Sequence, residues 1–363
     1  MAQETRDKMP YESYTIAVIC AMSFEMSAFR YMLDREHPRL QRKEGDSNTY
    51  VLGELYGNNI VLACLPGNQG KGSAATVATN LARTFPAIKL RFLVGIGGGV
   101  PSTKHDIRLG DVVVSMPSGE YGGVVQYDLG KKTDYGFVLK GFLQPPPPLL
   151  RSAVETMRSD HLVSDNKIEE FISQMLQKGP RLSDYYQQPS TKSDILFTKG
   201  YSHEFNELTC DRCDRERIVT RNVRQFPGPE IHYGLIASGD TVMRSSSSNA
   251  ASYLEDVLCF EMEAAGLMTE YSCLVIRGIS DYADSHKNDK WQKYAAATAA
   301  ACTKELLSYL QPNENVSAAA GSSLPLLTRD DGSVPNNTSH FSGRGIQHTG
   351  AGTFSVGGDV NIG

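Results

Sequence analysis

The chain has 363 residues, of which 40% are hydrophobic and 21% charged, and its formal net charge is −5. This is an ordinary globular composition that excludes wholesale disorder, and the length corresponds to roughly two domains of about 150 residues. The negative charge argues against a general nucleic-acid binder, and the short apolar runs argue against a membrane span. The seven cysteines and the polar N-terminus predict a cytoplasmic protein with reduced thiols.

In the first third of the chain, apolar segments of strand length alternate with segments of helical length. We expect strands over 15–22, twice within 48–67, over 90–100 and over 111–117, and helices over 24–33 and 70–85. Strands that alternate with helices in this way predict a layered α/β domain.

The middle of the chain is less regular. Four prolines at 145–148 interrupt regular structure, and the segment 179–230 is polar and rich in expected loops. Amphipathic helices are expected over 149–160 and 166–177, strands over 231–239 and 273–281, and a long helix over 289–310. Pro312 prevents this last helix from continuing.

The composition changes after Pro312. Residues 312–342 are rich in Ser, Asn, Pro and Ala, which predicts a disordered, flexible linker. Residues 343–363 contain seven glycines with β-forming residues between them, and they have neither proline nor the three-residue period of collagen. Such a segment is either an unstructured tail or a β-prone motif that stacks with copies of itself.

Acidic residues lie at the ends of expected strands or on the adjoining turns. They are Glu25, Asp240, the pair Glu261 and Glu263, and Asp281 with Asp284. Ligands of open α/β sheets bind outside the carboxyl ends of the strands, where carboxylates suit acid–base catalysis. Each acid by itself fits a helix cap or a solvated turn equally well, so this pattern alone leaves the function open.

The order of the motifs is more specific. AMSFE, VGIGGG, GDVVVS, ASGD, EMEA and RGISDYAD follow one another along the chain. Over roughly residues 14–310 this order resembles the nucleoside phosphorylase/nucleosidase superfamily, with motifs most similar to those of methylthioadenosine/adenosylhomocysteine nucleosidases. The insertion at 131–230 and the segment YGGVVQYDLGK look more like the phosphorylase-type domain of fungal immune-receptor-like proteins. The resemblance implies one domain over 14–311, a three-layer α/β fold with a central mixed, twisted sheet flanked by helices.

The resemblance also implies roles for individual residues. Glu25 would activate the attacking water, and Asp281 would protonate the purine at N7, with Ser280 beside it. Met262 would pack on the sugar and Glu263 would bind its hydroxyl groups. Two further positions belong to the expected substrate site: Gly97, in the glycine-rich strand end, and Val242, which stands where the family has an aromatic residue against the purine. This last departure puts tight selectivity for the base in doubt.

The absence of a phosphate-binding pair of residues indicates which nucleophile the chain uses. Phosphorylases of the superfamily have a phosphate-binding Arg and Ser where this chain has Leu93 and Ile96, and an apolar pair cannot replace these donors. Hydrolysis is therefore favoured. Phosphorolysis stays an alternative, because the nearby Arg91 offers a positive charge to a phosphate ion. The glycine-containing loop before the helix at 70–85 is either a tight turn or an anion site. In the second case Lys71 and Arg108 would contact a 5′-phosphate, which would admit nucleotides including ATP.

His203, Cys210 and Cys213 form an H-x₆-C-x₂-C pattern. A CxxC pair is half of a typical zinc site, but the other half is missing from this segment. Structural thiols are the favoured interpretation, so that we expect no metal and no cofactor.

The resulting hypothesis is an N-glycosidase that hydrolyses the purine–ribose bond of an adenine nucleoside or nucleotide, in a homo-oligomer. Residues 343–363 resemble the glycine-rich amyloid motifs of fungal immune-receptor gene clusters, which implies a cell-death effector and a receptor partner with a matching motif. A phosphorylase, a signalling module that acts mainly by assembly, and an inactive fold are the alternatives.

Overall fold

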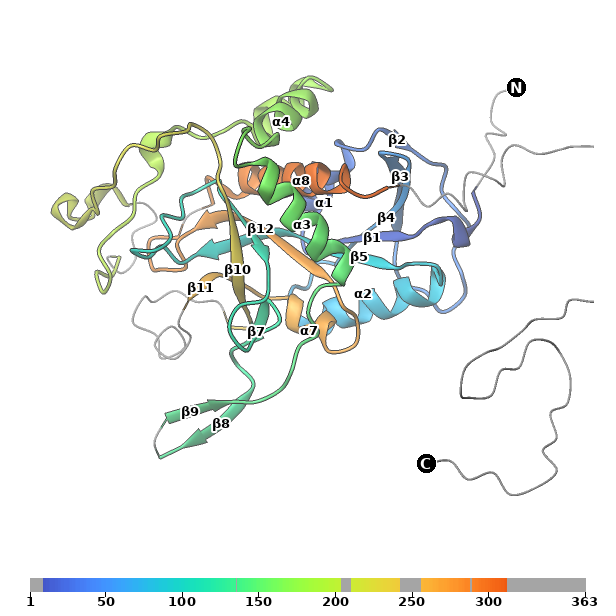
Figure 1. Ribbon diagram of the computed structural model, residues 1–363, viewed down its shortest axis with the longest axis horizontal. Coiled ribbons are helices and arrows are strands. Elements are labelled where there is room, and N and C mark those ends of the chain that lie inside the picture. The colour runs from blue at the N-terminus through green and yellow to red at the C-terminus, as the bar shows by residue number, and fades with distance from the viewer. Residues whose placement is uncertain (1–8, 135, 204–209, 242–255, 288, 312–363) are drawn as a thin grey trace, which may run out of the picture. The chain divides into compact units, whose positions relative to one another are not determined.

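The structure is a computed structural model that describes residues 9–134, 136–203, 210–241, 256–287 and 289–311 (Figure 1). The expected linker at 312–342, the expected motif at 343–363 and Val242 lie outside these residues, so the predictions made for them stay predictions. Among the described helices, none combines the length and the apolar character that crossing a lipid bilayer requires.

A ten-stranded mixed sheet forms the centre of the fold. Its order is β11 (Val257–Glu261), β10 (Ile231–Ser238), β6 (Val112–Ser115), β12 (Leu274–Asp281), β5 (Leu90–Gly99), β1 (Ile16–Cys20), β4 (Asn58–Cys64), β3 (Tyr50–Leu55) and β2 (Arg35–Glu36), with β7 (Val124–Gln126) beside β10. Strands β4, β1, β5 and β12 run parallel, whereas β6 is antiparallel to β12. All residues of β1 and β12 are buried, as expected for parallel strands covered on both faces.

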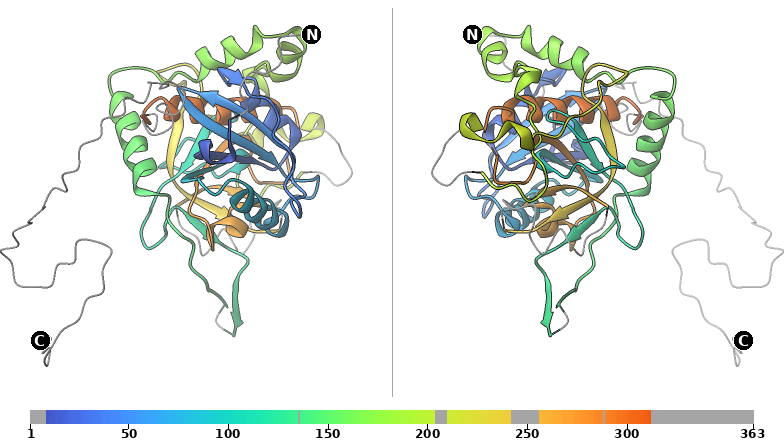
Figure 2. Two further views of the ribbon diagram at one scale, coloured as in Figure 1. Left: turned by 90° about the vertical axis from the view of Figure 1, so that its right-hand side faces the viewer. Right: turned by 90° about the vertical axis from the view of Figure 1, so that its left-hand side faces the viewer.

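Helices cover both faces of this sheet. On one face, helices α1 (Ser23–Arg30) and α8 (Gln292–Leu307) pack together. Around α8 lie α3 (Pro148–Asp160), α4 (Ile168–Leu176) and α5 (Pro180–Tyr186). On the other face, α2 (Lys71–Thr84) pairs with α7 (Ala264–Met268) (Figures 1 and 2). Because α8 is rich in alanine, its backbone lies close to β12, and a Cβ on Gly278 would come within 1.8 Å of the Ala295 carbonyl oxygen. The expected three-layer α/β fold is confirmed.

The glycine-rich end of β5 joins two parts of the sheet. Gly98 and Gly99 pair antiparallel with Phe260 and Cys259 of β11, so that β5, β12, β6, β10 and β11 form a closed ring. This crossing needs glycine, because a Cβ on Gly97 would lie 2.8 Å from the Cys259 sulfur. The closure brings the ends of β5, β11 and β12 together.

The insertion contains more structure than its sequence predicts. A hairpin of β8 (Gly130–Thr133) and β9 (Gly136–Leu139) extends away from the sheet, as the green strands in Figure 2 show. Its residues are exposed or half-buried, so no buried face marks it in the sequence. The segment 179–230 holds α5 and three short 3₁₀ turns, η2 (Thr191–Ser193), η3 (Cys210–Arg212) and η4 (Arg215–Arg217); a fourth, η1 (Tyr11–Ser13), precedes β1.

Candidate active site

A cavity of about 160 Å³ lies where β1, β5 and β12 end. Its walls also include the end of β11 and the turn that leads into α7. This is the edge where ligands of α/β sheets bind. Six of the predicted site residues line it: Glu25, Gly97, Met262, Glu263, Ser280 and Asp281.

Glu25 lies on the first turn of α1, directly after β1, and its side chain turns back into the cavity. One carboxylate oxygen accepts hydrogen bonds from the backbone N–H groups of Ala21 (2.9 Å) and Met22 (2.8 Å), and the other accepts from that of Ile96 (2.8 Å). Burial raises the pKa of Glu25 to about 7, although the nearby Arg277 opposes this shift. A carboxyl group with such a pKa can take up a proton at neutral pH, as a general base must.

Arg277, in the middle of β12, supplies the positive charge at the floor of the cavity. Its Nη2 donates to Glu261 in a short hydrogen bond and to Glu263 Oε2 at 3.2 Å. Glu261 also accepts a hydrogen bond from the Glu263 backbone N–H (3.0 Å) at the start of α7. Glu261 is therefore occupied by Arg277 and by the backbone, whereas Glu263 faces the cavity.

Glu263 places one carboxylate oxygen between the end of β11 and the start of α2. Its Oε1 accepts only a 3.1 Å hydrogen bond from the Gly70 backbone N–H, among the interactions of the described residues. Burial raises the pKa of Glu263, and Arg277 counteracts this effect. Each carboxylate oxygen can accept a second hydrogen bond, so Glu263 can bind a sugar hydroxyl without losing these partners.

Asp281 closes β12 on the opposite wall and is surrounded by donors. Its Oδ2 accepts from Ser280 Oγ at 2.8 Å and lies 3.1 Å from the Lys287 ammonium, and its Oδ1 accepts from the Ala283 backbone N–H at 3.0 Å. All three groups stabilise the carboxylate form. Gly98 makes room for this arrangement, because a Cβ there would lie 2.9 Å from Asp281 Oδ1.

The structure does not bring Lys71 or Arg108 to the cavity. Lys71 Nζ lies 2.7 Å from Asp128 and 3.3 Å from Asp240, and Asp240 also accepts the Lys71 backbone N–H at 3.0 Å. Asp240 thus binds the N-terminus of α2, as expected of a cap. Arg108 pairs with Asp106 at 2.5 Å. Both cations pair with carboxylates and lie outside this cavity, so their expected contact with a 5′-phosphate stays a prediction.

Arg91 does not reach the cavity either. It lies at the beginning of β5, whereas the cavity is at the end of this strand, and its guanidinium stacks over the Tyr271 ring at 5.0 Å from the centroid. Val242, the expected contact to the base, lies outside the described residues. Phe260, however, lines the cavity from β11.

A second, larger cavity of about 460 Å³ adjoins the first through Phe260 and Ala283. Its walls come from the segment after β5 and from the insertion, and they include the apolar side chains of Leu196 and Phe197 and the ring of Tyr282. It is therefore a mainly apolar chamber next to Asp281, of a size that accommodates a small organic ligand, and its walls also include the charged residues Asp106, Lys199, Arg221 and Asp284.

The sequence model of the phosphorylase superfamily matches residues 15–308. The chain belongs to this superfamily. One relative, a nucleotide-binding leucine-rich repeat (NLR)-like protein of Hyaloscypha variabilis, is 42% identical over 309 residues. That match covers 85% of this chain and 30% of the relative, so the chain spans less than a third of the relative's length.

Solved structures of the same fold include nucleosidases and a futalosine hydrolase. The 5′-methylthioadenosine/S-adenosylhomocysteine nucleosidase of Neisseria meningitidis superposes with a TM-score of 0.53 at 22% identity, over 82% of this chain and 99% of its own. The futalosine hydrolase of Helicobacter pylori gives 0.52 at 18%, over 82% and 99%, and the nucleosidase of S. pneumoniae gives 0.52 at 20%, over 82% and 100%. At these identities the likeness shows the fold.

Sequence reasoning missed Phe260 and two charged residues of the site. Arg277 stands in the otherwise apolar strand segment LVIRGIS, and a lone arginine in a buried strand signals a buried carboxylate partner. Lys287 follows Asp281 on an irregular segment and carries no pattern of its own. Its contact with Asp281 depends on how the chain turns after β12.

Proposed function

We propose that the chain is an N-glycosidase that hydrolyses the purine–ribose bond of an adenine nucleoside or nucleotide. The observation that carries this proposal is the arrangement of Glu25, Glu263 and Asp281 on one small cavity at the carboxyl ends of the strands. Membership of the phosphorylase superfamily and the nucleosidase fold of the structural neighbours support it.

Breaking an N-glycosidic bond resembles cleavage of an O-glycoside, which passes through a sugar oxocarbenium-like state. In the proposed mechanism protonated Asp281 delivers its proton to N7 of the purine as the bond between C1′ and the base breaks. The bond electrons leave with the base, and a water molecule attacks C1′. Glu25 takes the proton of that water, while Glu263 holds the ribose hydroxyl groups.

The donors around Asp281 suit this proton transfer. After it gives up its proton, Asp281 becomes a carboxylate that Ser280, Lys287 and the Ala283 N–H stabilise at 2.8–3.1 Å. The acid must hold a proton when the substrate is bound, because that proton is transferred to N7 in the proposed step. Glu25 must instead be ionised, and its pKa of about 7 permits this at neutral pH.

Water is proposed as the nucleophile because the cavity offers little to a phosphate ion. Two cations, Arg277 and Lys287, occur among its described lining residues, and both already pair with carboxylates. A phosphate would also meet four acidic groups, Glu25, Glu261, Glu263 and Asp281. Phosphorolysis would need donors that these walls do not supply.

We further propose that the purine lies in the larger cavity, against Phe260 and Tyr282. Phe260 would then supply the aromatic contact that Val242 cannot. Apolar contacts and aromatic rings are the usual lining of sites for flat ligands. Replacing Phe260 with leucine should therefore raise KM more than it lowers kcat.

The direct test incubates the protein with ATP, AMP, adenosine and methylthioadenosine, with and without phosphate, and identifies the products by chromatography. We expect two products, free adenine and a sugar that carries no phosphate on C1. Their rate of formation should be the same with and without phosphate. Base release that requires phosphate would instead identify a phosphorylase. No base release from any of the four compounds would contradict the proposal.

We also propose that the domain serves as an immune or cell-death effector that is brought together through residues 343–363. The name of the Hyaloscypha variabilis relative, an NLR-like protein, supports the association with receptors. A chain that lacks 343–363 should fail to assemble while it still releases the base. If that shortened chain still forms ordered fibrils, the assembly role of the segment is refuted.

A further inference from the structure

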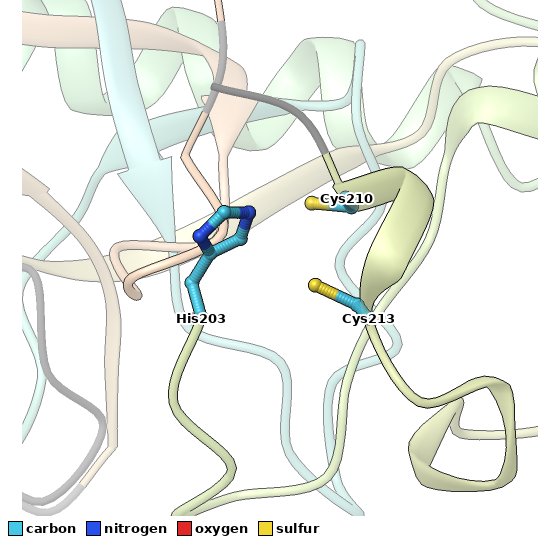
Figure 3. Close-up of side chains that lie close together, drawn as sticks. All are labelled: His203, Cys210 and Cys213. Atoms are coloured by element: carbon cyan, nitrogen blue, oxygen red, sulfur yellow. The ribbon is translucent and has the colours of Figure 1, made fainter. Parts of the chain in front are cut away.

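A group of thiols and imidazole rings lies on the far side of Asp281, between the insertion and the segment after β12. Its centre is the His-Cys cluster, which we define as His203, Cys210 and Cys213. The sulfur atoms and a ring nitrogen of this cluster lie within 4.8 Å of one another. Figure 3 shows both sulfur atoms, on either end of the η3 turn, directed toward the His203 ring.

The missing half of this site comes from another part of the chain. His286 follows Asp281 by a few residues, and its ring centroid lies 5.4 Å from that of His203. The residue is only 7% exposed, and neither ring nitrogen makes a hydrogen bond among the described residues, although Nδ1 lies 3.6 Å from an Asp284 carboxylate oxygen. The Cys210 sulfur also lies 3.9 Å from the His286 carbonyl oxygen. An unsatisfied buried imidazole of this kind requires an explanation.

We propose that the His-Cys cluster binds a zinc ion, with His286 as the fourth ligand. Two thiolates and two imidazoles form a typical closed, tetrahedral zinc site, and thiolate ligands select zinc over magnesium or calcium. Zinc–sulfur bonds of about 2.3 Å place two sulfur ligands about 3.8 Å apart, so the two sulfur atoms of the cluster need to approach each other by at most roughly 1 Å. His286 lies outside the group of atoms within 4.8 Å of one another and has to move further to bind the same ion. Binding releases the two thiol protons to the solvent and changes no oxidation state.

The zinc would connect the insertion to the wall of the active site. The two parts already touch, since the His203 backbone N–H donates to Ser285 Oγ at 2.8 Å and Phe197 stacks on His286 at 4.1 Å. The cluster and Asp281 line the same cavity of about 360 Å³. The ion would thus fix the segment that carries Asp284 to Lys287. This inference does not depend on the proposed hydrolase activity.

The test measures metal in the full-length protein, purified without chelators from cells supplied with zinc. We expect close to one zinc per chain by elemental analysis. Replacing the bound metal with cobalt should give a thiolate-to-metal charge-transfer absorption together with the visible bands of a tetrahedral site. The double variant Cys210→Ser/Cys213→Ser should bind at most about a tenth of the metal that the wild-type protein binds. The control Cys64→Ser removes a thiol outside the cluster and should keep the zinc.

The role of His286 is tested separately by the variant His286→Asn, which should weaken cobalt binding at least about tenfold while circular dichroism stays unchanged. Unaltered cobalt affinity of this variant would overturn His286 as the fourth ligand. The decisive measurement uses the wild-type protein, so a negative result cannot be attributed to a misfolded variant. Wild-type protein without zinc that also shows no cobalt charge-transfer band would overturn it. A Cys210–Cys213 disulfide in the freshly purified protein would do so as well.

Discussion

The raised pKa of Glu25 links the proposed catalytic role of this residue to the stability of the fold, and this link can be measured. The pKa is about 7 in the folded protein against 4.5 for an ordinary glutamate. Folding therefore favours the protonated form, so the contribution of Glu25 is greatest below about pH 4.5 and is lost as the pH rises through about 7. At 1.36 kcal/mol per pKa unit, the total loss is about 3 kcal/mol, of which about 2 kcal/mol falls between about pH 5.5 and pH 8.

The variant Glu25→Gln removes this titration. It also places an amide N–H₂ opposite a backbone N–H donor, which adds a cost that is independent of pH. The informative quantity is thus the change with pH of the difference in unfolding free energy between variant and wild type. Measured by urea denaturation, this difference should shift by about 2 kcal/mol in favour of the variant from about pH 5.5 to pH 8.

A matched control is Glu36→Gln. The hydrogen bond from Arg30 lowers the pKa of Glu36, so any stability that depends on its charge is lost only at lower pH. The control difference should stay flat over the same range. A flat difference for Glu25→Gln as well would refute the assignment of a raised pKa to this buried group. The wild-type kcat/KM should in addition rise with pH through about 7, since Glu25 must be ionised to act as a base.

Three other substitutions test the site. Asp281→Asn keeps the shape of the side chain but cannot supply a proton, so kcat should fall about 10²–10⁴-fold with little change in melting temperature; a loss below about tenfold would exclude general-acid catalysis by this residue. Gly98→Ala places a Cβ 2.9 Å from Asp281 Oδ1 and should lower kcat, whereas its control Gly72→Ala, in open space on α2, should stabilise the fold by about 0.4–1 kcal/mol and leave kcat unchanged. Arg277→Met leaves buried carboxylates without their counter-charge and should destabilise the protein by about 3–5 kcal/mol in urea unfolding; a loss below about 1 kcal/mol would contradict the buried network.

The sequence predicts those features of the fold that depend on neighbouring residues or on a family pattern. The fully buried strands stand out as continuous apolar runs, and Glu25, Glu263 and Asp281 stand out through the order of their motifs. Contacts between distant segments are not visible in this way. The pairing of Lys71 with Asp128, for example, depends on where α2 meets the segment after β7.

The same limit applies to the zinc proposal. The CxxC pair is visible in the sequence, but His286 lies on a different segment, and only the packing of the insertion against the end of β12 brings the two together. The hairpin β8–β9 is not predicted from the sequence for a different reason. Strand β8 (GKKT) has no apolar residue and β9 (GFVL) has only a short apolar run, so no buried face marks the hairpin in the sequence.

The buried guanidinium of Arg277 has a consequence for the time at which activity appears during synthesis. It binds carboxylates near the end of β11, and its charge also acts on Glu25 of α1, which leaves the ribosome early. Arg277 and Asp281 lie on β12, the last of the described strands, and emerge much later. A nascent or truncated chain therefore has no complete set of acidic groups and no counter-charge to hold them. An enzyme that attacks nucleosides would thus stay harmless until nearly the whole domain has been translated.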